Sequence, residues 1–414
     1  MPDQNLDRLA LPDEVRAMIA LHDRRLGTEE VALAEAAGRI LAVDLVADED
    51  HPPFRAATMD GFAVVAHDGS PWREVIGEQT AGFVLDVEVT PGTAVRITTG
   101  APVPAGADAV VKVEATEPAE QNHVIILQED VADGENVRQV GADLRRGDVV
   151  VPAGVRLGPA ELGLAAGLGA NPLPVSRRPR VSILSTGDEL VEPGAAVGPG
   201  QIYDANRFSL IAAVRQAGAE VVWAGKGPDE REALRDVLRE RIAASDVVLT
   251  SGGVSMGELD LIKPLLGELA TVHLRRVFMK PGKPLNFATS GETRIFGLPG
   301  NPVSALVAFE VFIRPMLLRM TGATETERPV ATVRLAQPAE PADRIEYQRA
   351  VVEIGGDGVL TARTNGLQAS SRLASFLGAN ALLVVPPRER VYERGEILRA
   401  MLLGTPRQED SPSA

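Results

Sequence analysis

Apolar runs and amphipathic segments alternate between Val181 and Met320, and this alternation restricts the fold more than any other feature of the sequence. Four short runs are typical of buried strands: Val181–Leu184, Val221–Ala224, Val247–Leu249 and Arg294–Leu298. Segments with helical spacing separate or follow them, with expected starts at Asn206, near Asp229 and at Asn301-Pro302. The pattern predicts a doubly wound α/β domain with a mostly parallel sheet.

Polar loops rich in glycine and hydroxyl residues adjoin these strands: STGDEL (185–190), TSGGVSMGELD (250–260), GLPGNPVS (297–304) and, between the last two, KPGKP (280–284). Such sheets bind ligands at the carboxyl ends of their strands, so we expect the loops to lie in one crevice. Glycine lets the backbone approach a ligand, and amides and hydroxyls bind anionic oxygens. Glu258 and Asp260 would repel an anion, which indicates a hard metal ion nearby. Taken alone, loop 250–260 fits a strand-to-helix turn rich in small residues equally well.

The sequence on either side of 181–320 has other spacings of apolar residues. Residues 12–40 have helical spacing and predict two helices separated at Leu26-Gly27-Thr28. A small β domain is predicted from five short runs bounded by turn residues: Phe62–Val65, Val84–Val89, Ala94–Ile97, Ala109–Val113 and Val124–Leu127. Further runs between 328 and 403 predict a C-terminal all-β domain. Residues 405–414 lack apolar content, which predicts a disordered tail.

Composition excludes several classes of protein. The net charge of −15 argues against binding to nucleic acid or an anionic membrane. The chain has no cysteine, which excludes disulfides, zinc–cysteine clusters and thiol nucleophiles, and it has only five histidines. Any metal held by protein must therefore rely mainly on oxygen ligands, which favours Mg²⁺. The sequence has no apolar run long enough for a membrane span and no secretory signal, so we expect a cytoplasmic protein.

Acidic residues recur in loops beside glycine or threonine, at Asp60, Asp143, Asp188, Glu189, Asp204, Asp229 and Asp260. Each alone is typical of a helix cap or a turn, whereas together, beside anion-binding loops, they indicate Mg²⁺ bound with a phosphorylated substrate. Lysine is rare: only five of the 42 basic residues are lysines, and two of them are Lys280 and Lys283. An ammonium is a compact point charge, so KPGK is a candidate site as well as a plain loop.

Seven motifs, in order and spacing, resemble the molybdopterin molybdenumtransferases, the molybdenum insertases of molybdenum-cofactor synthesis, and the homologous domain of the scaffold protein gephyrin. They are TMDGFAV (58–64), TTGAPVPAGADAVV (98–111), STGDELVEPG (185–194), GQIYDANR (200–207), TSGGVSMGELD, KPGKP and GLPGNPVSA (297–305). The resemblance covers nearly the whole chain, from about Leu11 to Leu402.

The resemblance implies a multi-domain α/β-plus-β protein: a central doubly wound α/β molybdopterin-binding domain (179–326), an inserted β domain (51–140), an N-terminal linker and dimerisation domain (1–50 with 141–178) and a C-terminal all-β domain (327–404). It implies a homodimer whose site is shared between subunits, with contacts to other proteins of molybdenum-cofactor synthesis. It further implies that molybdenum from molybdate is inserted into adenylylated molybdopterin, with Mg²⁺-dependent cleavage of the phosphoanhydride and release of AMP.

The resemblance also assigns roles residue by residue. Asp60, Glu189, Asp229 and Asp260 would act on Mg²⁺ and the anhydride, with Glu189 and Asp260 as metal ligands, and Lys280 and Lys283 would neutralise oxyanion charge. The implied substrate-binding residues are Thr99, Asp143, Ser185, Thr186, Gly187, Asp188, Ser251, Gly252, Gly253, Ser255, Pro299, Gly300, Pro302, Ser371 and Arg372. Asp60, Thr99 and Asp143 would reach across the dimer.

Two alternatives remain at this stage. Molybdopterin adenylyltransferases share the TSGGVS-type loop, so only the flanking β domains and the TMDG and TTGAP motifs favour an insertase. A non-catalytic scaffold of the same fold is the second alternative, against which the complete acidic set argues. Nothing in the sequence separates molybdate from tungstate.

Overall fold

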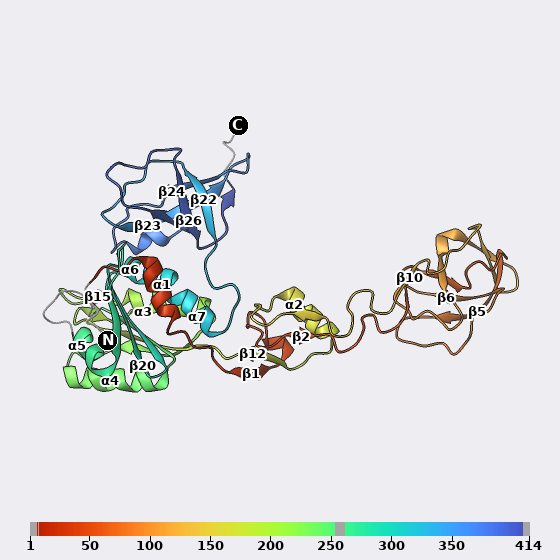
Figure 1. Ribbon diagram of the computed structural model, residues 1–414, viewed down its shortest axis with the longest axis horizontal. Coiled ribbons are helices and arrows are strands. Elements are labelled where there is room, and N and C mark those ends of the chain that lie inside the picture. Colours follow the sequence, from red (N-terminus) through yellow and green to blue (C-terminus); the bar gives the residue numbers. More distant parts are fainter. Residues whose placement is uncertain (1–5, 7, 253–260, 409–414) are drawn as a thin grey trace. The chain divides into compact units, whose positions relative to one another are not determined.

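The computed structural model describes residue 6 and residues 8–252 and 261–408 (Figure 1). The chain divides into two compact units. The larger unit contains the described residues of 1–42, 153–158 and 172–414, and the smaller unit contains 43–152 and 159–171. Across these described ranges, no helix has the length and apolar character needed to cross a membrane. The finer domain boundaries given above stay a prediction.

A six-stranded sheet forms the centre of the larger unit, in the order β16-β13-β17-β21-β20-β18. The first four strands are parallel, and β20 and β18 run antiparallel to their neighbours. The strands are β13 (Arg180–Ser185), β16 (Glu220–Lys226), β17 (Val247–Ser251), β18 (Thr271–Arg276), β20 (Pro284–Ser290) and β21 (Thr293–Leu298). The helices between them are α3 (Ala205–Gln216), α4 (Arg231–Ala244) and α5 (Ile262–Leu269). The predicted doubly wound α/β domain is confirmed.

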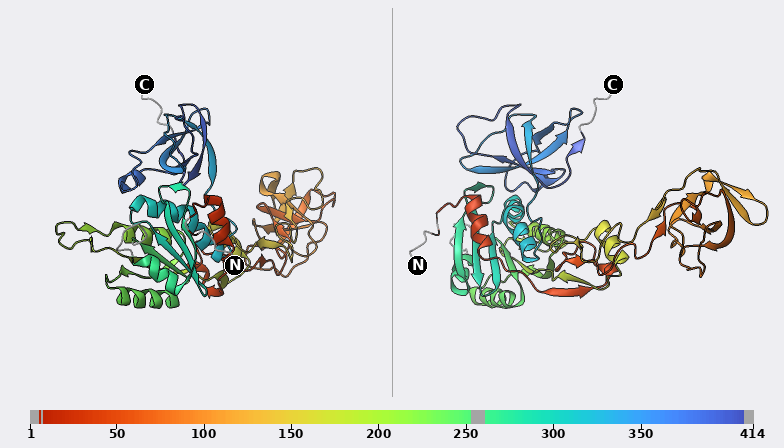
Figure 2. Two further views of the ribbon diagram at one scale, coloured as in Figure 1. Left: turned by 60° about the vertical axis from the view of Figure 1, so that its left-hand side comes forward. Right: turned by 45° about the vertical axis from the view of Figure 1, so that its right-hand side comes forward.

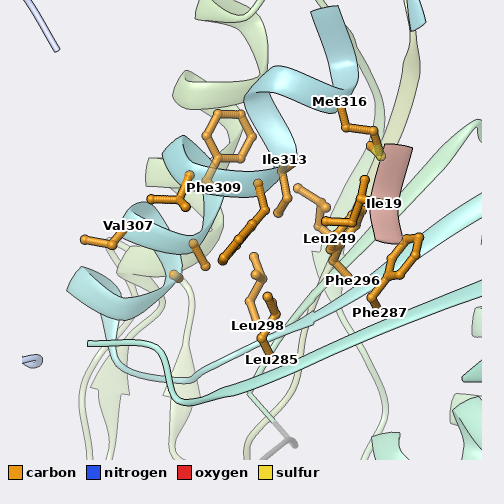
Figure 3. Close-up of a cluster of buried hydrophobic side chains, with 14 of the residues drawn as sticks. Ile19, Leu249, Leu285, Phe287, Phe296, Leu298, Val307, Phe309, Ile313 and Met316 are labelled. Atoms are coloured by element: carbon orange, nitrogen blue, oxygen red, sulfur yellow. The ribbon is translucent and has the colours of Figure 1, made fainter. Parts of the chain in front are cut away.

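Helices cover both faces of this sheet because successive strand residues point to opposite sides. Leu184, Val248 and Ile295 pack with α4 and α5. The other face, which includes Leu249 and Phe296, packs with α1 (Pro12–Ala20), α3 and the final helix of the domain (Figure 3). Full burial of each such side chain contributes roughly 1.5–3 kcal/mol, which fixes the strand register.

The final helix starts behind Asn301 with Pro302 at its first position and ends at Met320, as predicted. It consists of α6 (Pro302–Ala308), a π-helical turn (Phe309–Ile313) and α7 (Arg314–Met320). The π-helical turn lies directly before Pro315, whose missing N–H and bulky ring are incompatible with a regular ladder of hydrogen bonds. Because the whole helix packs on the sheet, the start of α6 and the preceding loop 299–301 are held in place.

The C-terminal strands close into a barrel in the order β23-β24-β22-β26-β25, with β25 pairing back to β23 (blue in Figure 2). They are β22 (Val330–Leu335), β23 (Ile345–Ile354), β24 (Leu360–Thr364), β25 (Ala381–Val385) and β26 (Ile397–Leu402). A separate apolar cluster fills the barrel. The short strand β19 (Met279–Lys280) pairs with β23, so the KPGKP loop is joined directly to the barrel. The predicted C-terminal β domain is confirmed.

A six-stranded sheet also forms the main part of the smaller unit, in the order β7-β4-β6-β5-β9-β8. Its strands are β4 (Gly61–Val64), β5 (Trp72–Gln79), β6 (Thr93–Ile97), β7 (Ala109–Lys112), β8 (Thr116–Ala119) and β9 (His123–Ile126). Apolar clusters lie on both of its faces. The unit also contains α2 (Pro159–Gly167) and two strand pairs, β2 (Leu45–Val46) with β11 (Val149–Val151) and β3 (Ala56–Ala57) with β10 (Val137–Arg138). The predicted β domain is confirmed.

Four local predictions are wrong, one of them in part. In the tail 405–414, predicted to be disordered, Arg407–Gln408 form strand β27, which pairs with β23, and residues 409–414 lie outside the described residues. The expected second N-terminal helix is instead β1 (Thr28–Val31), which pairs with β12 (Leu173–Ser176), followed by a single 3-10 turn. No strand forms over 84–89, where only Glu88 makes an isolated bridge. The cap of α3 is Asp204, whose carboxylate accepts from the Arg207 amide, and Asn206 lies inside the helix.

Two histidines stack at the edge of the larger unit's sheet. The rings of His22 and His273 lie 4.1 Å apart between centroids, and His273 Nε2 is 2.8 Å from Thr289 Oγ1. Burial lowers the pKa of both imidazoles; the Arg294 charge lowers the His22 pKa further, Asp23 opposes that change, and His22 lowers the His273 pKa. The folded protein therefore holds both rings neutral at a pH where the unfolded chain would protonate them.

This pair predicts a loss of stability in mild acid. Because both pKa values are lowered on folding, the pair's contribution is complete above the unfolded value of about pH 6.5 and is lost as the pH falls toward the folded values. His273→Gln keeps a polar partner for Thr289 and is expected to reduce the fall in Tm between neutral pH and about pH 5.5. Thermal melting across this range checks it, with His123→Gln, outside this cluster, as control. Parallel curves for His273→Gln and wild type would contradict it.

Candidate functional site

Three parallel strands end side by side in the larger unit. Ser185, Ser251 and Leu298, at the carboxyl ends of β13, β17 and β21, occupy the same register position. The Thr186 amide donates to the Ser251 carbonyl at 3.0 Å, and the Gly252 amide donates to the Leu298 carbonyl at 3.2 Å. The loops that begin at 186, 252 and 299 therefore start at one edge of the sheet, as expected.

Glycine is required at position 252, where two of these loops approach each other. Gly252 has φ +89°, and a Cβ there would lie 2.4 Å from the Thr186 carbonyl oxygen. A Cβ on Gly300 would lie 3.7 Å from the Gly252 Cα. Gly187 has φ +144°, and a Cβ there would meet the Glu189 carboxylate at 2.5 Å. Predicted residues from all three loops are thus in direct contact.

The first turn of α3 ties the strand ends together. Asp204 accepts from the Ser185 hydroxyl at 2.5 Å and is 2% exposed. Asn206 Nδ2 donates to Ser251 Oγ at 2.8 Å and to the Gly300 carbonyl at 2.7 Å. Ser185 and Ser251 are themselves buried, so in this arrangement they support the loops. Sequence reasoning missed the linking role of Asn206, although the GQIYDANR motif contains it.

Two hydroxyls beside the glycines are buried and have no hydrogen-bond partner among the described residues. Thr186 Oγ1 and Thr250 Oγ1 have no hydrogen bond within the described part of the chain. Buried polar groups are nearly always paired, so orphan donors at a strand end are consistent with a polar ligand. Gly253, Ser255, Glu258 and Asp260 lie outside the described residues.

Carboxylates gather next to these loops. Partial burial raises the Asp229 pKa, a hydrogen bond with Asp188 raises it further, and the charges of Asp188 and Glu189 act in the same direction. Lys226 Nζ, 3.8 Å from Asp229 Oδ2, opposes the change. Neighbouring carboxylates repel one another when they are all ionised, and a bound cation would relieve this repulsion. Over residues 6, 8–252 and 261–408, however, no three acidic or histidine side chains already form a metal-binding group.

A cavity of about 580 Å³ lies beside these loops, between KPGKP and the C-terminal barrel. Lys280, Lys283 and Pro299 line it, together with Asn301, Ser304, Arg344, Gln368, Ala369 and Ser370. Pro302 starts α6 directly after Asn301, and Ser371 and Arg372 follow Ser370 in the chain. The Val303 amide donates to the Ser370 carbonyl at 3.2 Å, which fixes the barrel loop against α6.

Sequence reasoning missed Arg344 and Gln368 at this cavity. Both belong to the barrel, and long-range contacts, the pairing of β19 with β23 and the bond from the Val303 amide to the Ser370 carbonyl, bring their loops to KPGKP. Arg344 follows a loop and precedes a strand, a position with no distinctive local pattern.

The predicted residues of the smaller unit form their own local contacts. Asp60, directly before β4, accepts from the Thr99 amide at 2.7 Å and the Thr99 hydroxyl at 2.8 Å. These bonds, the amide first, lower the Asp60 pKa, so the exposed carboxylate stays ionised. A Cβ on Gly61 would lie 1.9 Å from the Val111 carbonyl oxygen, which fixes this start of the strand. Asp143 forms an ion pair with Arg138.

Comparison with known families gives three matches that follow one another along the chain. Residues 10–169 match the family described as "MoeA N-terminal region (domain I and II)". Residues 182–319 match the "Probable molybdopterin binding domain", and residues 332–403 match the "MoeA C-terminal region (domain IV)". The flanking matches show that the chain is more than an isolated molybdopterin-binding domain.

Curated relatives and solved structures agree. Molybdopterin molybdenumtransferase of Haemophilus influenzae is 35% identical over 89% of this chain and 92% of its own length. Gephyrin of Dictyostelium discoideum is 35% identical over 91% of this chain, which spans only 59% of gephyrin. A crystal structure of the molybdopterin biosynthesis protein MoeA from Pyrococcus horikoshii superposes with a TM-score of 0.83 at 30% identity, covering 96% of this chain and 100% of that one. The chain belongs to the molybdopterin molybdenumtransferase family, the MoeA enzymes of molybdenum-cofactor biosynthesis.

Proposed function

We propose that the protein inserts molybdenum from molybdate into adenylylated molybdopterin, with Mg²⁺-dependent cleavage of the phosphoanhydride and release of AMP. The observation that carries this proposal is the contact between the glycine loops at 186, 252 and 300, beside the carboxylates of Asp188, Glu189 and Asp229. Backbone amides and the orphan hydroxyls of Thr186 and Thr250 would bind the phosphate oxygens of the substrate.

The acidic side chains suit a hard cation. Glu189 and Asp229 are the described candidates, and Asp260 is the predicted third. Mg²⁺ usually takes one or two protein carboxylates and completes its shell with water and substrate phosphates, so the site does not need a group of three converging ligands, and none is present among the described residues. When bound, Mg²⁺ would supply charge neutralisation at the phosphoanhydride. The chain's own part is to hold the carboxylates and the phosphate-binding loops in register.

The cavity beside KPGKP suits the oxyanion substrate. Lys280 and Lys283 line it, and Arg344 adds a third cationic side chain. A small dianion gains most from several cationic donors in a partly enclosed space, where solvent screens less. Ser371 and Arg372 follow directly on the lining loop and would border the same space. Pro299 lines the wall shared with the strand-end loops.

We further propose that the site is completed in a homodimer. Asp60, Thr99 and Asp143 would then come from the second subunit, with Asp60 kept ionised by its two bonds from Thr99. Support for this arrangement is the family membership and the exposure of Asp60. Contacts with other proteins of cofactor synthesis are part of the same proposal.

Release of AMP tests the reaction. Purified protein with Mg²⁺ and adenylylated molybdopterin is expected to release AMP quickly with molybdate and much more slowly without it. Quantification of AMP by chromatography over time measures both rates. A second series with EDTA in place of Mg²⁺ is expected to lose the molybdate-dependent part. Equal rates with and without molybdate would overturn the insertase assignment.

A further inference from the structure

A buried carboxylate stands behind one of the two lysines of the cavity. Glu346 lies on β23 of the C-terminal barrel and is 2% exposed. Its partners are Lys280 Nζ, 3.2 Å from Oε1, and Gln348 Nε2, 3.1 Å from Oε2. A buried charge without a partner is costly, so the ammonium of Lys280 stabilises this carboxylate strongly.

The backbone makes this contact specific. Lys280 and Glu346 are register partners in the parallel pair β19–β23, so both side chains start from fixed positions. The Lys280 side chain is half exposed and lines the cavity, whereas Glu346 faces away from solvent. The side chain of Lys283, three residues on, makes no hydrogen bond or ion pair with any described residue. The two lysines thus differ: Lys280 is anchored by a buried acid, and Lys283 has no such anchor among the described residues.

We propose that Glu346 is a positioning residue that holds Lys280 and weakens the binding of the oxyanion in the cavity. This inference rests on the proposed function, in which the cavity takes molybdate. A dianion at Lys280 must share the ammonium with Glu346 and is repelled by the buried carboxylate, which water screens poorly. Tight ground-state binding of a substrate does not raise kcat, so a counter-charge that fixes the lysine while limiting affinity favours turnover.

Titration of molybdate alone into the full-length protein, by calorimetry, tests this proposal. Glu346→Gln keeps the side-chain shape and removes the charge, and it is expected to lower the Kd for molybdate by about tenfold. Glu353→Gln is the matched control: it removes one negative charge from another acid of β23, which pairs with Arg363 outside the cavity lining, and its Kd is expected to change by less than about twofold. Unchanged or weaker binding by Glu346→Gln, or an equal effect of Glu353→Gln, would overturn the inference.

Turnover gives a second readout that a merely structural role would not produce. Glu346→Gln is expected to lower both KM for molybdate and kcat, because the oxyanion binds more tightly while Lys280 loses its fixed position. A rise in KM would contradict the proposal. Wild-type protein that binds no molybdate at all would instead refute the oxyanion cavity and, with it, the proposed function of these lysines.

A stability cycle tests the pair without any ligand. Lys280→Met is expected to lower the Tm, since it removes the ion-pair partner of the buried Glu346 and leaves it the Gln348 amide at 3.1 Å and the nearby charge of Arg349. Adding Glu346→Gln to Lys280→Met is expected to recover most of that loss, although molybdate binding stays weak. Additive losses in the double variant would show that the two side chains are not coupled and would overturn the inference, even if Glu346→Gln alone folded poorly.

Discussion

Replacing Gly252 with alanine is expected to lower kcat/KM for AMP release by about 100-fold. The new Cβ would lie 2.4 Å from the Thr186 carbonyl oxygen, which belongs to backbone and cannot rotate away. One of the two loops must move, and a shift of about 1 Å at a positioned reacting group is enough for such a loss. The positive φ of +89° adds a stability cost of about 1–2 kcal/mol, which the fold should survive.

Gly267→Ala is the matched control for this prediction. Gly267 lies within α5 without a positive φ, and a Cβ there would meet no heavy atom of the described residues within 4 Å, so alanine fits without any shift. Alanine at a helical position should stabilise by up to about 1 kcal/mol and leave turnover within about twofold. Steady-state AMP release and thermal melting of both variants give the comparison. Normal turnover in Gly252→Ala would show that close contact between the loops is not needed.

The central α/β domain could be predicted from the sequence because its strands are short apolar runs. Val247–Leu249 is buried on both faces, as a strand between two helical layers must be. Strand β5 was missed for the opposite reason: its buried positions include Arg73 and Gln79, so its pattern resembles an exposed segment. Arg73 is buried because Asp68 pairs with it at 2.8 Å, and that partner cannot be inferred from spacing.

Contacts between residues far apart in the sequence explain the other wrong or missing predictions. Val31 has the spacing of a helix, but β1 pairs with β12, which begins at Leu173, and this pairing overrides local propensity. Asp204 and Asn206 are both good caps, and Asp204 takes the role because its carboxylate also binds the Ser185 hydroxyl. The lysines of the cavity were predicted from their rarity, whereas Glu346 was not, because it lies in a polar stretch with Gln348 and Arg349 and its burial has no local signal.

Asp229→Asn is expected to change activity and stability in opposite directions. Burial and the nearby Asp188 raise the Asp229 pKa, so ionised Asp229 opposes folding at neutral pH. The sign follows from linkage: the folded state binds its proton more tightly, and stability is gained as the pH falls through the folded pKa. A neutral amide removes this repulsion, so the Tm without Mg²⁺ should rise. If Asp229 acts on Mg²⁺ and the anhydride, AMP release should fall by about 100-fold in the same variant.

The effect of Mg²⁺ on the Tm distinguishes a metal-binding role of Asp229 from a purely structural role. An ion that binds only the folded state raises the Tm, so MgCl₂ should stabilise the wild type and have much less effect on Asp229→Asn. Asp236→Asn is the control, since this exposed acid on α4 pairs with Arg239 at 2.9 Å and should retain both the Mg²⁺ response and the turnover. A lower Tm for Asp229→Asn in the absence of Mg²⁺ would mean that Lys226 outweighs the neighbouring acids. A full Mg²⁺ response with normal turnover would place the cation elsewhere. A higher Tm together with slower AMP release in Asp229→Asn is the result expected when a carboxylate serves the reaction and destabilises the fold.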